Sequence, residues 1–497
     1  MREDTYIMEK IKISYTEQGI LDFFAQIPYA AILDSSLTMD CLGRFTIIGY
    51  DPFLIFQSKN GRGRLRGKNI QEDAHGNPLE ILRKLLQRYQ NSWHEEEVPF
   101  LGGCIGYFSY DLVRFIEDLP SLNRDDIGAN DLELGFYHKI LVMDHHKGDI
   151  YAIGTSVGCE TEEVEAAASD NLKEIKKVLK QYEEMAACSA KSNSDDQLKE
   201  RASAGHDSIA GSEINHRIAE DSPNFLAANF SERGYRRMIS RVREYIRCGD
   251  IFQANLSQRF TAEIDSDPSK IYALLRQASP APFSAYLNFD QLKIISSSPE
   301  RFLKIKDRAI ETRPIKGTRP RGRSREEDAL NRAELLNSAK DRAELTMIVD
   351  LARNDLGKVC EIGSVAVEQL REVEEYANVF HLVAAVSGKL RKDIDVVDCL
   401  YAAFPGGSIT GAPKVRACEI IEELEPVKRG VYTGSIGYLG FNGEADLNIA
   451  IRTIIVKAKR AYYNVGGGIV WDSEPAKEYE ETLHKGKMMM RVLCSIL

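Results

Sequence analysis

The stretch SIGYLGFNGEADLNIAIRTIIVKAKRAYYNVGGGIV, residues 435–470, decides the fold class. Asn442-Gly443 lies between two runs of alternating apolar and polar residues, which predicts a tight turn joining two antiparallel strands. These strands lead into a further run, YYNVGGGIV, and then into a helix expected from about residue 474. Hairpins separated by helices favour large antiparallel sheets over a doubly wound parallel sheet.

The residues upstream of this stretch continue the same pattern. A helix is expected over 233–248, because its apolar residues form one stripe and Gly249 follows as a C-terminal stop. A single charged helix is expected over 324–353. Between these two helices, tight polar turns separate four predicted strands, at 283–289, 292–297, 301–305 and 308–313.

The amino-terminal part predicts mostly sheet, followed by one long helix. Short alternating runs broken by Gly, Pro and Asn extend from Tyr6 to about Thr155, and residues 162–188 carry apolar positions at helical spacing among many Glu and Lys. Ser, Asp, Ala and Gly then dominate, which is typical of a flexible linker or insertion. The sequence therefore divides into an amino-terminal region, a linker and a carboxy-terminal catalytic domain, at 1–188, 189–222 and 223–497.

Composition excludes several classes of protein. The chain has 497 residues, 43% hydrophobic and 28% charged, and its 65 Lys and Arg against 75 Asp and Glu give a formal charge of −10. This balance excludes global disorder and disfavours binding to a phosphate backbone. No run reaches the roughly 18 apolar residues of a membrane span, and nine cysteines without a C-x-x-C pair fit reduced thiols. We expect a cytoplasmic globular protein with small-molecule ligands and with no nucleic acid or membrane as partner.

Two acidic pairs lie on predicted helices. Asp341 and Glu344 are three residues apart, as are Glu478 and Glu481, so each pair shares one helical face. Each pair alone is explained by a solvated charged face. Brought together, the two faces offer four oxygen-bearing side chains, more than Mg²⁺ usually takes directly, because it keeps waters and binds substrate oxygens.

Lys316, in PIKGT, is a candidate nucleophile. An amine attacks only when it is neutral, and the reference pKa of lysine is about 10.4. Lowering that pKa toward 8 requires burial or nearby cations worth roughly 3 kcal/mol. Arg313, Arg319 and Arg321 are nearby cations in the sequence. The alternative is a solvated loop lysine.

Two glycine-rich segments and one arginine are further candidates. GGSITGAPK, residues 406–414, lacks the spacing of a phosphate loop and predicts either a plain turn and helix cap or a helix N-terminus that holds an anion. Glycines 466–468 either let backbone amides approach a ligand or form a tight bend between strands. Arg452 follows LNIAI in a predicted buried strand, so it needs a carboxylate partner or an anionic ligand.

Taken together, these segments resemble the chorismate-using enzymes of the anthranilate synthase component I family. The resemblance implies an α+β fold, with two large antiparallel β-sheets packed as a sandwich and helices outside. It covers about residues 230–490, and GRF at 43–45 and GGCIGYFSYDLVR at 102–114 resemble the family's amino-terminal part. The motifs that carry it are FQANLSQR (252–259), SSSPERF (296–302), PIKGTRPRG (314–322), DRAELTMIVDLARNDLG (341–357), FPGGSITGAPKVRACEII (404–421), YTGSIGY (432–438), GGGIVWDS (466–473) and EYEETLHKGK (478–487).

The resemblance implies a reaction and its catalytic residues. Members that form anthranilate have alanine at the position of Lys316, whereas PIKGT with GGSITGAPK is similar to members that form 4-amino-4-deoxychorismate for 4-aminobenzoate and folate synthesis. In the implied mechanism, Lys316 adds to C2 of chorismate as the C4 hydroxyl leaves, Glu300 is the general acid, and ammonia enters at C4. His381 is expected at the ring. Gln253 replaces a lysine that activates water in isochorismate-forming relatives, which favours ammonia as the nucleophile.

The resemblance also implies ligands, a cofactor and a partner. Mg²⁺ would be held by Glu344 and Glu481, with Asp341 and Glu478 acting directly or through water. A separate glutamine amidotransferase subunit would supply ammonia. The residues expected to bind substrate are Thr318, Tyr432, Arg452, Gly467, Gly468 and Lys485.

A second pocket is implied, in which family members hold tryptophan. The matching segments depart from the typical LLES and PYM, because this chain has LDS and PFS. We therefore expect bound tryptophan without feedback inhibition, and the alternative is ordinary core packing. The matching residues are Ser35, Gly43, Arg44, Phe45, Thr46, Pro282, Phe283 and Ser284.

Two other functions stay open at this point. The first is an anthranilate synthase component I, in tryptophan synthesis, that carries an atypical lysine. The second is a non-catalytic subunit that only binds and regulates a glutaminase. The presence of a motif residue at each expected position argues against the second.

Overall fold

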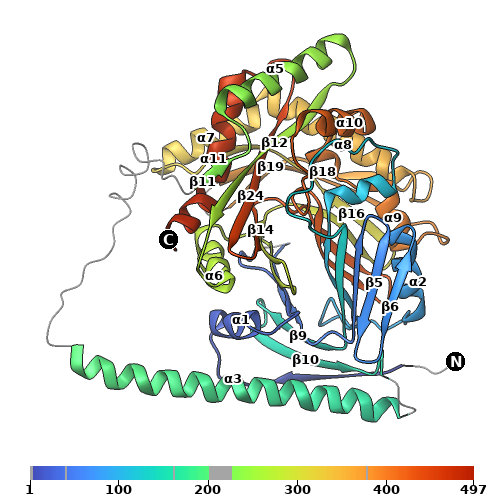
Figure 1. The fold of residues 1–497 in the computed structure, drawn as a ribbon, viewed down its shortest axis with the longest axis vertical. Coiled ribbons are helices and arrows are strands. Elements are labelled where there is room, and N and C mark those ends of the chain that lie inside the picture. The colour runs from blue at the N-terminus through green and yellow to red at the C-terminus, as the bar shows by residue number, and fades with distance from the viewer. Residues whose placement is uncertain (1–3, 40–41, 160–162, 201–225, 377–378, 497) are drawn as a thin grey trace.

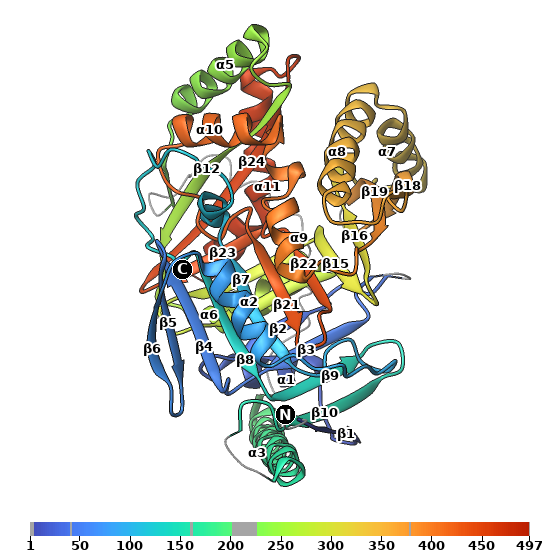
Figure 2. The same cartoon turned by 90° about the vertical axis from the view of Figure 1, so that its right-hand side faces the viewer.

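The fold is a sandwich of two twelve-stranded antiparallel sheets with helices on the outside (Figures 1 and 2). The computed structural model describes residues 4–39, 42–159, 163–200, 226–376 and 379–496. The α+β class and the paired sheets agree with the expectation from the resemblance. None of the described helices combines the length and the apolar character needed to cross a bilayer.

The first sheet contains strands from both ends of the chain. Its strands, in spatial order, are β1 (Tyr6–Ile11), β10 (Asp149–Thr155), β9 (Lys139–Asp144), β3 (Phe45–Gly49), β2 (Ala31–Asp34), β13 (Phe283–Asn288), β14 (Lys293–Ser298), β23 (Thr453–Lys457), β24 (Arg460–Ile469), β12 (Gln253–Glu263) and β11 (Leu226–Ala228), with β20 (Gly411–Ala412) paired to β12.

The second sheet is built in the same mixed way. Its strands, in spatial order, are β17 (Ile315–Pro320), β19 (Val379–Lys389), β16 (Ala309–Arg313), β15 (Arg301–Lys306), β22 (Ala445–Asn448), β21 (Ser435–Gly440), β7 (Gly103–Phe108), β8 (Leu132–Tyr137), β4 (Leu54–Lys59), β5 (Arg62–Gly67) and β6 (Gln71–His75), with β18 (Ala366–Glu375) paired to β19.

The stretch 435–470 passes through both sheets. Its hairpin turns at Asn442-Gly443, where Gly443 has a φ of +84° that favours glycine, and joins β21 to β22 in the second sheet. The chain then crosses to the first sheet and forms β23 and β24. Residues 449–452 make this crossing, and Arg452 is therefore at a bend directly before β23, not inside a strand as expected.

The amino-terminal and carboxy-terminal regions share both sheets. Strand β2 pairs with β13, with Leu33 opposite Ala285, and strand β7 pairs with β21, with Gly106 opposite Gly437. Regions far apart in sequence therefore form continuous sheets, and the amino-terminal region supports the strands that carry the carboxy-terminal motifs.

The helices cover the outer faces of the two sheets. They are α1 (Glu17–Ala25), α2 (Pro78–Arg88), α3 (Val164–Glu200), α5 (Glu232–Cys248), α6 (Pro268–Ala278), α7 (Arg325–Asn337), α8 (Ala339–Gly357), α9 (Val396–Ala403), α10 (Lys414–Leu424) and α11 (Pro475–Cys494), with short 3₁₀ turns at Tyr110–Phe115 and Gly407–Ile409. Helix α5 ends at Gly249 with a φ of +84°, as its sequence predicts.

Two expectations about helices are corrected. The single helix over 324–353 is in fact two helices, α7 and α8, because Ser338 is extended and its hydroxyl accepts a hydrogen bond from Asp341 N to start α8. Helix α3 continues to Glu200, so the first part of the expected linker is helical. Residues 201–222 of that linker lie outside the described residues.

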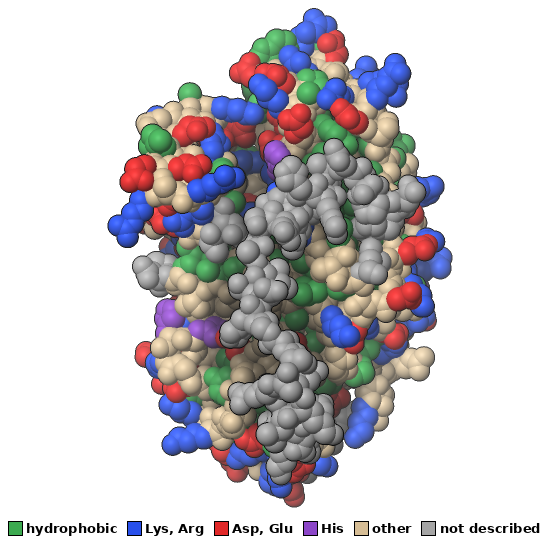
Figure 3. Space-filling view, turned by 90° about the vertical axis from the view of Figure 1, so that its left-hand side faces the viewer, with side chains coloured by type: hydrophobic (Ala, Val, Ile, Leu, Met, Phe, Trp, Pro, Cys, Tyr) green, Lys and Arg blue, Asp and Glu red, His purple; other side chains and the backbone are tan. Residues whose placement is uncertain are grey.

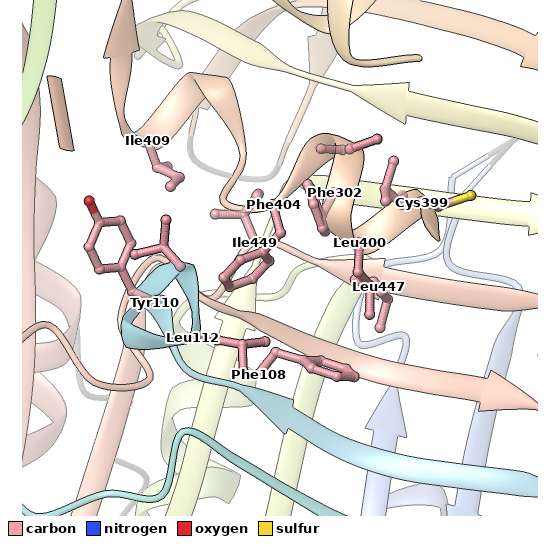
Figure 4. Close-up of a cluster of buried hydrophobic side chains, with 14 of the residues drawn as sticks. Phe108, Tyr110, Leu112, Phe302, Cys399, Leu400, Phe404, Ile409, Leu447 and Ile449 are labelled. Atoms are coloured by element: carbon pink, nitrogen blue, oxygen red, sulfur yellow. The ribbon is translucent and has the colours of Figure 1, made fainter. Parts of the chain in front are cut away.

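Apolar side chains fill three buried clusters. One lies between the sheets and joins residues such as Ile47 and Ile294 of the first sheet to Ile105 and Ile436 of the second. A second lies under α1, α3, α6 and α11 on the outer face of the first sheet. The third covers the outer face of the second sheet, where Phe404 and Ile409 pack with the strands (Figure 4). This third cluster supports the loop that carries part of the site described next.

Candidate active site

The sequence motifs converge between α8 on the second sheet and α11 on the first. In Figure 2, α7 and α8 stand apart from α5, α10 and α11. Figure 3, which views the molecule from the left of Figure 1, shows acidic and basic side chains intermixed on the upper part of this face. Strands β17 and β19, the crossing before β23 and the end of β24 supply the other residues of the site.

Lys316 lies on β17, where the pairing with β19 shifts between Lys316 and Thr318. Gly317, at the shift, has a φ of +71°, and a Cβ there would lie 2.8 Å from Leu335 Cδ1, so only glycine fits. Lys316 Nζ donates a hydrogen bond to Ser408 O at 2.8 Å. Desolvation by the surrounding protein lowers the pKa of Lys316, although nearby carboxylates oppose the shift. The side chain is therefore not the solvated loop lysine that was the alternative.

Glu300 is buried next to Lys316. Its Oε1 accepts hydrogen bonds from Ser408 Oγ at 2.5 Å and from Ile315 N at 3.4 Å. Burial raises the pKa of Glu300 above its ordinary value. Ser408 thus contacts the lysine through its carbonyl and the carboxyl through its hydroxyl. Apart from the position of Ser408 in GGSITGAPK, no sequence pattern predicts this role.

His381 is buried and lies between Arg452, which is partly buried, and Thr318. Arg452 Nη2 donates to His381 Nε2 at 3.2 Å, so the other ring nitrogen carries the proton, and it lies 3.0 Å from Thr318 Oγ1. Burial, with the charge of Arg452, lowers the pKa of His381 to about 3, so the ring is neutral. Thr318 itself is exposed.

Arg452 has no counter-ion among the described residues. Its φ is +50°, in the left-handed region that residues other than glycine rarely adopt. Desolvation lowers the pKa of its guanidinium, and no carboxylate of the described chain forms an ion pair with it. Of the two explanations offered by the sequence, a carboxylate partner and an anionic ligand, the structure leaves the anionic ligand.

The four acidic residues, two on α8 and two on α11, each lie near a basic side chain. Asp341 pairs with Arg319 at 3.1 Å, and Glu481 pairs with Lys485 at 2.7 Å. Lys340 Nζ lies 3.8 Å from both Glu344 Oε1 and Glu478 Oε1. Their arrangement is set by α8 and α11, as the spacing predicted. The solvated face is not what the structure shows, because three of these carboxyl groups are largely buried.

The carboxyl groups differ in their electrostatics. Burial raises the pKa of Glu344, and it also raises the pKa of Glu478, although Ser473 Oγ donates to Glu478 at 2.6 Å. For Glu481, desolvation acts in the same direction, but the charge and hydrogen bond of Lys485 outweigh it and lower the pKa. Glu344 Oε1 is buried and has no hydrogen-bond partner.

These carboxylates do not yet form a closed ligand cage. A metal site needs three or more His, Cys, Asp or Glu side chains whose ligand atoms lie close together. In the described part of the chain, the group with all such atoms within 4.8 Å of one another consists of His94, Asp307 and Glu444. Two of those three residues are exposed, and Glu444 lines a different pocket. Metal binding between α8 and α11 would require their carboxylates to draw together.

The glycine segment 466–468 lies inside β24 and is not a bend. Its residues pair in register with β12, from Gly466 opposite Ser257 to Gly468 opposite Asn255. A Cβ on Gly467 would lie 3.3 Å from both Glu478 Oε2 and Glu481 Oε1, and one on Gly468 would lie 2.3 Å from Gln253 Nε2. The absence of side chains therefore lets the acidic helix and Gln253 approach the strand.

Gln253, Tyr432 and Lys485 complete this side of the site. Gln253 Oε1 is buried without a hydrogen-bond partner. Tyr432 is buried, and burial raises the pKa of its hydroxyl. Lys485 Nζ donates to Gly466 O at 3.0 Å. The loop after Ser408 reaches the same strands, because Gly411–Ala412 pairs with Gln253 and Ala254.

The residues of the implied tryptophan site surround a real pocket, of about 1210 Å³ including its open mouth. Seven of the eight line it, whereas Thr46 is turned away, with its hydroxyl bound to Asp34 Oδ1 at 3.2 Å and to His145 at 2.8 Å. Arg301 and Asp446, which the sequence did not single out, also line it and pair at 3.0 Å. An open pocket is different from the ordinary core packing that was the alternative.

Comparisons with known proteins agree with this geometry. A sequence profile of the chorismate binding enzymes matches residues 39–491. Anthranilate synthase component 1 of Acetivibrio thermocellus is 39% identical over 452 residues, 90% of this chain and 87% of that protein. Aminodeoxychorismate synthase component 1 of Bacillus subtilis (strain 168) is 37% identical over 482 residues, 97% of this chain and 96% of that protein.

A solved structure gives the same result. Anthranilate synthase component I from Streptococcus pneumoniae TIGR4 has a TM-score of 0.73 and 34% identity, over 91% of this chain and 93% of that chain. The relatives carry two different names, so the reaction has to be argued from the residues of the site.

Proposed function

Because the chain belongs to the chorismate binding enzyme family, we propose that it aminates chorismate at C4 to give 4-amino-4-deoxychorismate, a precursor of 4-aminobenzoate and folate. The family membership supports a chorismate-using enzyme of the anthranilate synthase and aminodeoxychorismate synthase type. The observation that carries the finer proposal is Lys316, whose pKa is lowered and whose amine lies beside a buried, protonatable carboxyl group.

The first step uses Lys316 and Glu300. The lone pair of Lys316 Nζ forms a bond to C2 of chorismate, the two ring double bonds each shift by one position, and the C4–O bond breaks. Glu300 gives its proton to the leaving hydroxyl, which departs as water. Burial lowers the pKa of Lys316, which favours the neutral amine, and raises the pKa of Glu300, which favours the protonated carboxyl group.

The second step reverses the shift of the double bonds. Ammonia forms a bond to C4, the double bonds return, and the C2–N bond breaks to release Lys316 as a neutral amine. The ammonium group formed at C4 then returns one proton to the Glu300 carboxylate. The enolpyruvyl group stays in place, and the overall change is chorismate plus ammonia to aminodeoxychorismate plus water. Gln253 Oε1, buried without a partner, is an acceptor for an N–H of ammonia and is too weakly basic to activate water.

The remaining residues orient the substrate. Arg452, without a counter-ion, would pair with one substrate carboxylate, and neutral His381 holds the guanidinium through Nε2. Lys485, Tyr432, Thr318 and the backbone amides of Gly467 and Gly468 would bind the other polar groups. The buried carbonyl of Ser408 fixes the amine of Lys316 before attack.

The residues also fit a magnesium ion. Glu344 Oε1 is buried and has no hydrogen-bond partner, and burial raises the pKa of both Glu344 and Glu478. A hard cation would therefore offset the cost of keeping these carboxylates charged inside the protein. We assign Glu344 and Glu481 as ligands, with Glu478 and Asp341 acting directly or through water. Mg²⁺ would supply charge neutralisation for a substrate carboxylate.

Ammonia is proposed to come from a separate amidotransferase subunit. The relatives are each named component 1 of a synthase, which fits a further component. The segment GGCIG at 102–106 matches the letters Gly-x-Cys-x-Gly of a glutaminase nucleophile, but Cys104 lies within β7 and is fully buried. Burial raises the pKa of its thiol to about 12, so Cys104 is not an exposed nucleophile.

The proposal is tested by product analysis. The purified chain is incubated with chorismate, ammonium salt and MgCl₂, and the products are separated and identified by mass. We expect a non-aromatic product that added aminodeoxychorismate lyase converts to 4-aminobenzoate. Fluorescent anthranilate formed without any lyase would contradict the proposal.

Anthranilate synthesis is the second candidate. It is favoured by the 39% identity to an anthranilate synthase component 1. The same assay separates the two activities, since only anthranilate synthesis eliminates the enolpyruvyl group as pyruvate. Pyruvate release equal to chorismate consumption would establish this second candidate.

The second pocket is proposed to hold tryptophan as a bound ligand without feedback inhibition. Its open volume and its mixture of acidic and basic walls suit an amino acid. Isothermal titration with tryptophan should show binding, while the rate of chorismate turnover stays within twofold. No heat of binding at 1 mM tryptophan would contradict this assignment.

A further inference from the structure

Lys340 lies between the two acidic helices and belongs to none of the roles assigned above. It is in the first turn of α8, and its Nζ is 3.8 Å from Glu344 Oε1 on its own helix and 3.8 Å from Glu478 Oε1 on α11. Its side chain is 51% exposed, whereas those of Glu344 and Glu478 are 14% and 5% exposed. A solvent-reachable ammonium group therefore bridges two largely buried carboxylates.

The other two carboxylates already have close partners. Asp341 pairs with Arg319 at 3.1 Å and Glu481 pairs with Lys485 at 2.7 Å. Glu344 and Glu478 instead share one lysine as their cation, at distances too long for a hydrogen bond. Glu478 Oε1 accepts a hydrogen bond from the neutral Ser473 Oγ, and Glu344 Oε1 has no hydrogen-bond partner. The weakest pairing in the group is thus the one that Lys340 makes.

We propose that Lys340 is the counter-ion of the metal-free site, which links α8 to α11 before the divalent cation binds and is displaced when it does. This rests on the magnesium site of the proposed function. The carboxylates do not converge enough to form a ligand cage, and the ammonium group lies 3.8 Å from two of them. An ammonium and a divalent cation cannot both occupy the space between Glu344 and Glu478, because they repel each other at these distances.

Displacement of Lys340 is easy on structural grounds. The side chain is half exposed and flexible, so its ammonium can move into water without burying an unpaired charge. The cation must therefore compete with an internal charge, which weakens its apparent affinity. In the metal-free protein, the same charge lies near both carboxylates and offsets the repulsion between Glu344 and Glu478.

The test measures Mg²⁺ binding directly and not only turnover. Isothermal titration with MgCl₂, and electron paramagnetic resonance with Mn²⁺, are applied to the full chain and to K340Q, K340R and K477Q. K477Q is the matched control, since it removes the same charge from α11, where the Lys477 side chain is 73% exposed and pairs with Glu474 at 2.8 Å. We expect K340Q to bind Mg²⁺ about 3- to 10-fold more tightly than the wild type.

The two other variants should bind Mg²⁺ within twofold of the wild type. K340R keeps the charge between the acidic helices, and K477Q removes an exposed charge that pairs with Glu474. In EDTA, K340Q should have a lower thermal midpoint than the wild type, and saturating Mg²⁺ should abolish the difference. An affinity of K340Q less than threefold tighter than the wild type, or equal tightening in K477Q, overturns the proposal. A wild type that binds no Mg²⁺ instead overturns the metal assignment of the proposed function.

Discussion

The site between α8 and α11 and the second pocket both contain charged side chains, but the arginines of the second pocket have close carboxylate partners, whereas Arg452 of the site has none among the described residues. In the second pocket, Arg301 contacts Asp446 and Glu311, each at 3.0 Å, and Arg44 contacts Asp144 at 2.7 Å. In the site, Arg452 has no counter-ion among the described residues, and Glu344 Oε1 has no hydrogen-bond partner.

This difference in pairing fits the proposed roles of the two regions, a reactive site and a ligand-binding pocket. A buried group without a partner is costly, so it persists where a ligand or a reaction meets its need. The paired charges of the second pocket already stabilise one another. A ligand there would gain binding free energy by fitting between them. Substitutions in the site should therefore change the rate with little loss of stability, and substitutions in the pocket should do the reverse.

The largest effect is expected for K316A. Removal of the nucleophile should lower kcat by about 10³-fold or more, because no other amine can form the bond to C2. The thermal midpoint should not fall, since the variant removes an amine whose charged form is destabilised by burial. Steady-state kinetics and thermal melts measure both quantities.

The control for this variant is K304A, because Lys304 lines the second pocket. It should keep kcat within twofold of the wild type. Undiminished aminodeoxychorismate formation by K316A would show that the lysine has been given too large a role.

The next effect is expected for E300Q, which keeps the size of the side chain but cannot donate the proton. The rate should fall by about 10²-fold or more. The raised pKa of Glu300 means that the folded protein holds a proton that the unfolded chain loses above about pH 4.3. Wild-type stability therefore decreases as the pH rises from that value through the folded-state pKa, and E300Q lacks this decrease.

Thermal melts at pH 5 and pH 8 check the sign of this linkage. The midpoint of E300Q relative to the wild type should be higher at pH 8 than at pH 5. A constant difference would mean that Glu300 titrates in the folded protein as it does in the unfolded chain.

The third effect compares one arginine from each region. R452Q should raise KM about 10- to 100-fold, through loss of charge-assisted hydrogen bonds to a substrate carboxylate, with no loss of thermal stability. R301Q should do the opposite, because it leaves Asp446 and Glu311 without their partner. KM for chorismate and the thermal midpoint of both variants test this. A fall in stability for R452Q with an unchanged KM would make Arg452 a structural residue.

Local sequence patterns predicted many of the helices and strands. They did not predict the features that depend on contacts between distant segments. The turn at Asn442-Gly443 and the end of α5 at Gly249 depend on glycine conformations that can be read from neighbouring residues. The crossing of the chain from one sheet to the other at 449–452 depends on how the sheets pack, so Arg452 was expected inside a strand. The break at Ser338 was missed because the helical pattern continues on both sides of it.

Prediction of the site from the sequence was limited in the same way, by contacts between distant segments. The spacing of Asp341 with Glu344, and of Glu478 with Glu481, predicts which residues share a helical face, but not which partner each carboxylate meets. Ser408 and Lys340 were missed because their contacts join segments 92 and 138 positions away in the chain, at Lys316 and Glu478. Such contacts have no signature in one sequence, whereas the motifs of the resemblance point to the residues that are proposed to bind the substrate.

The smallest effect is expected for R44A, at the wall of the second pocket. Arg44 donates two hydrogen bonds to Asp144, whose carboxylate is fully buried and also accepts from His146 N at 3.0 Å. Loss of the guanidinium should lower the free energy of unfolding by about 1–2 kcal/mol, since the backbone donors remain. Catalysis should change less than twofold, because Arg44 contacts no residue of the site between α8 and α11. Chemical denaturation and kcat/KM measure the two quantities, and a tenfold loss of kcat/KM would mean that the two regions are coupled, which the paired charges of the pocket argue against.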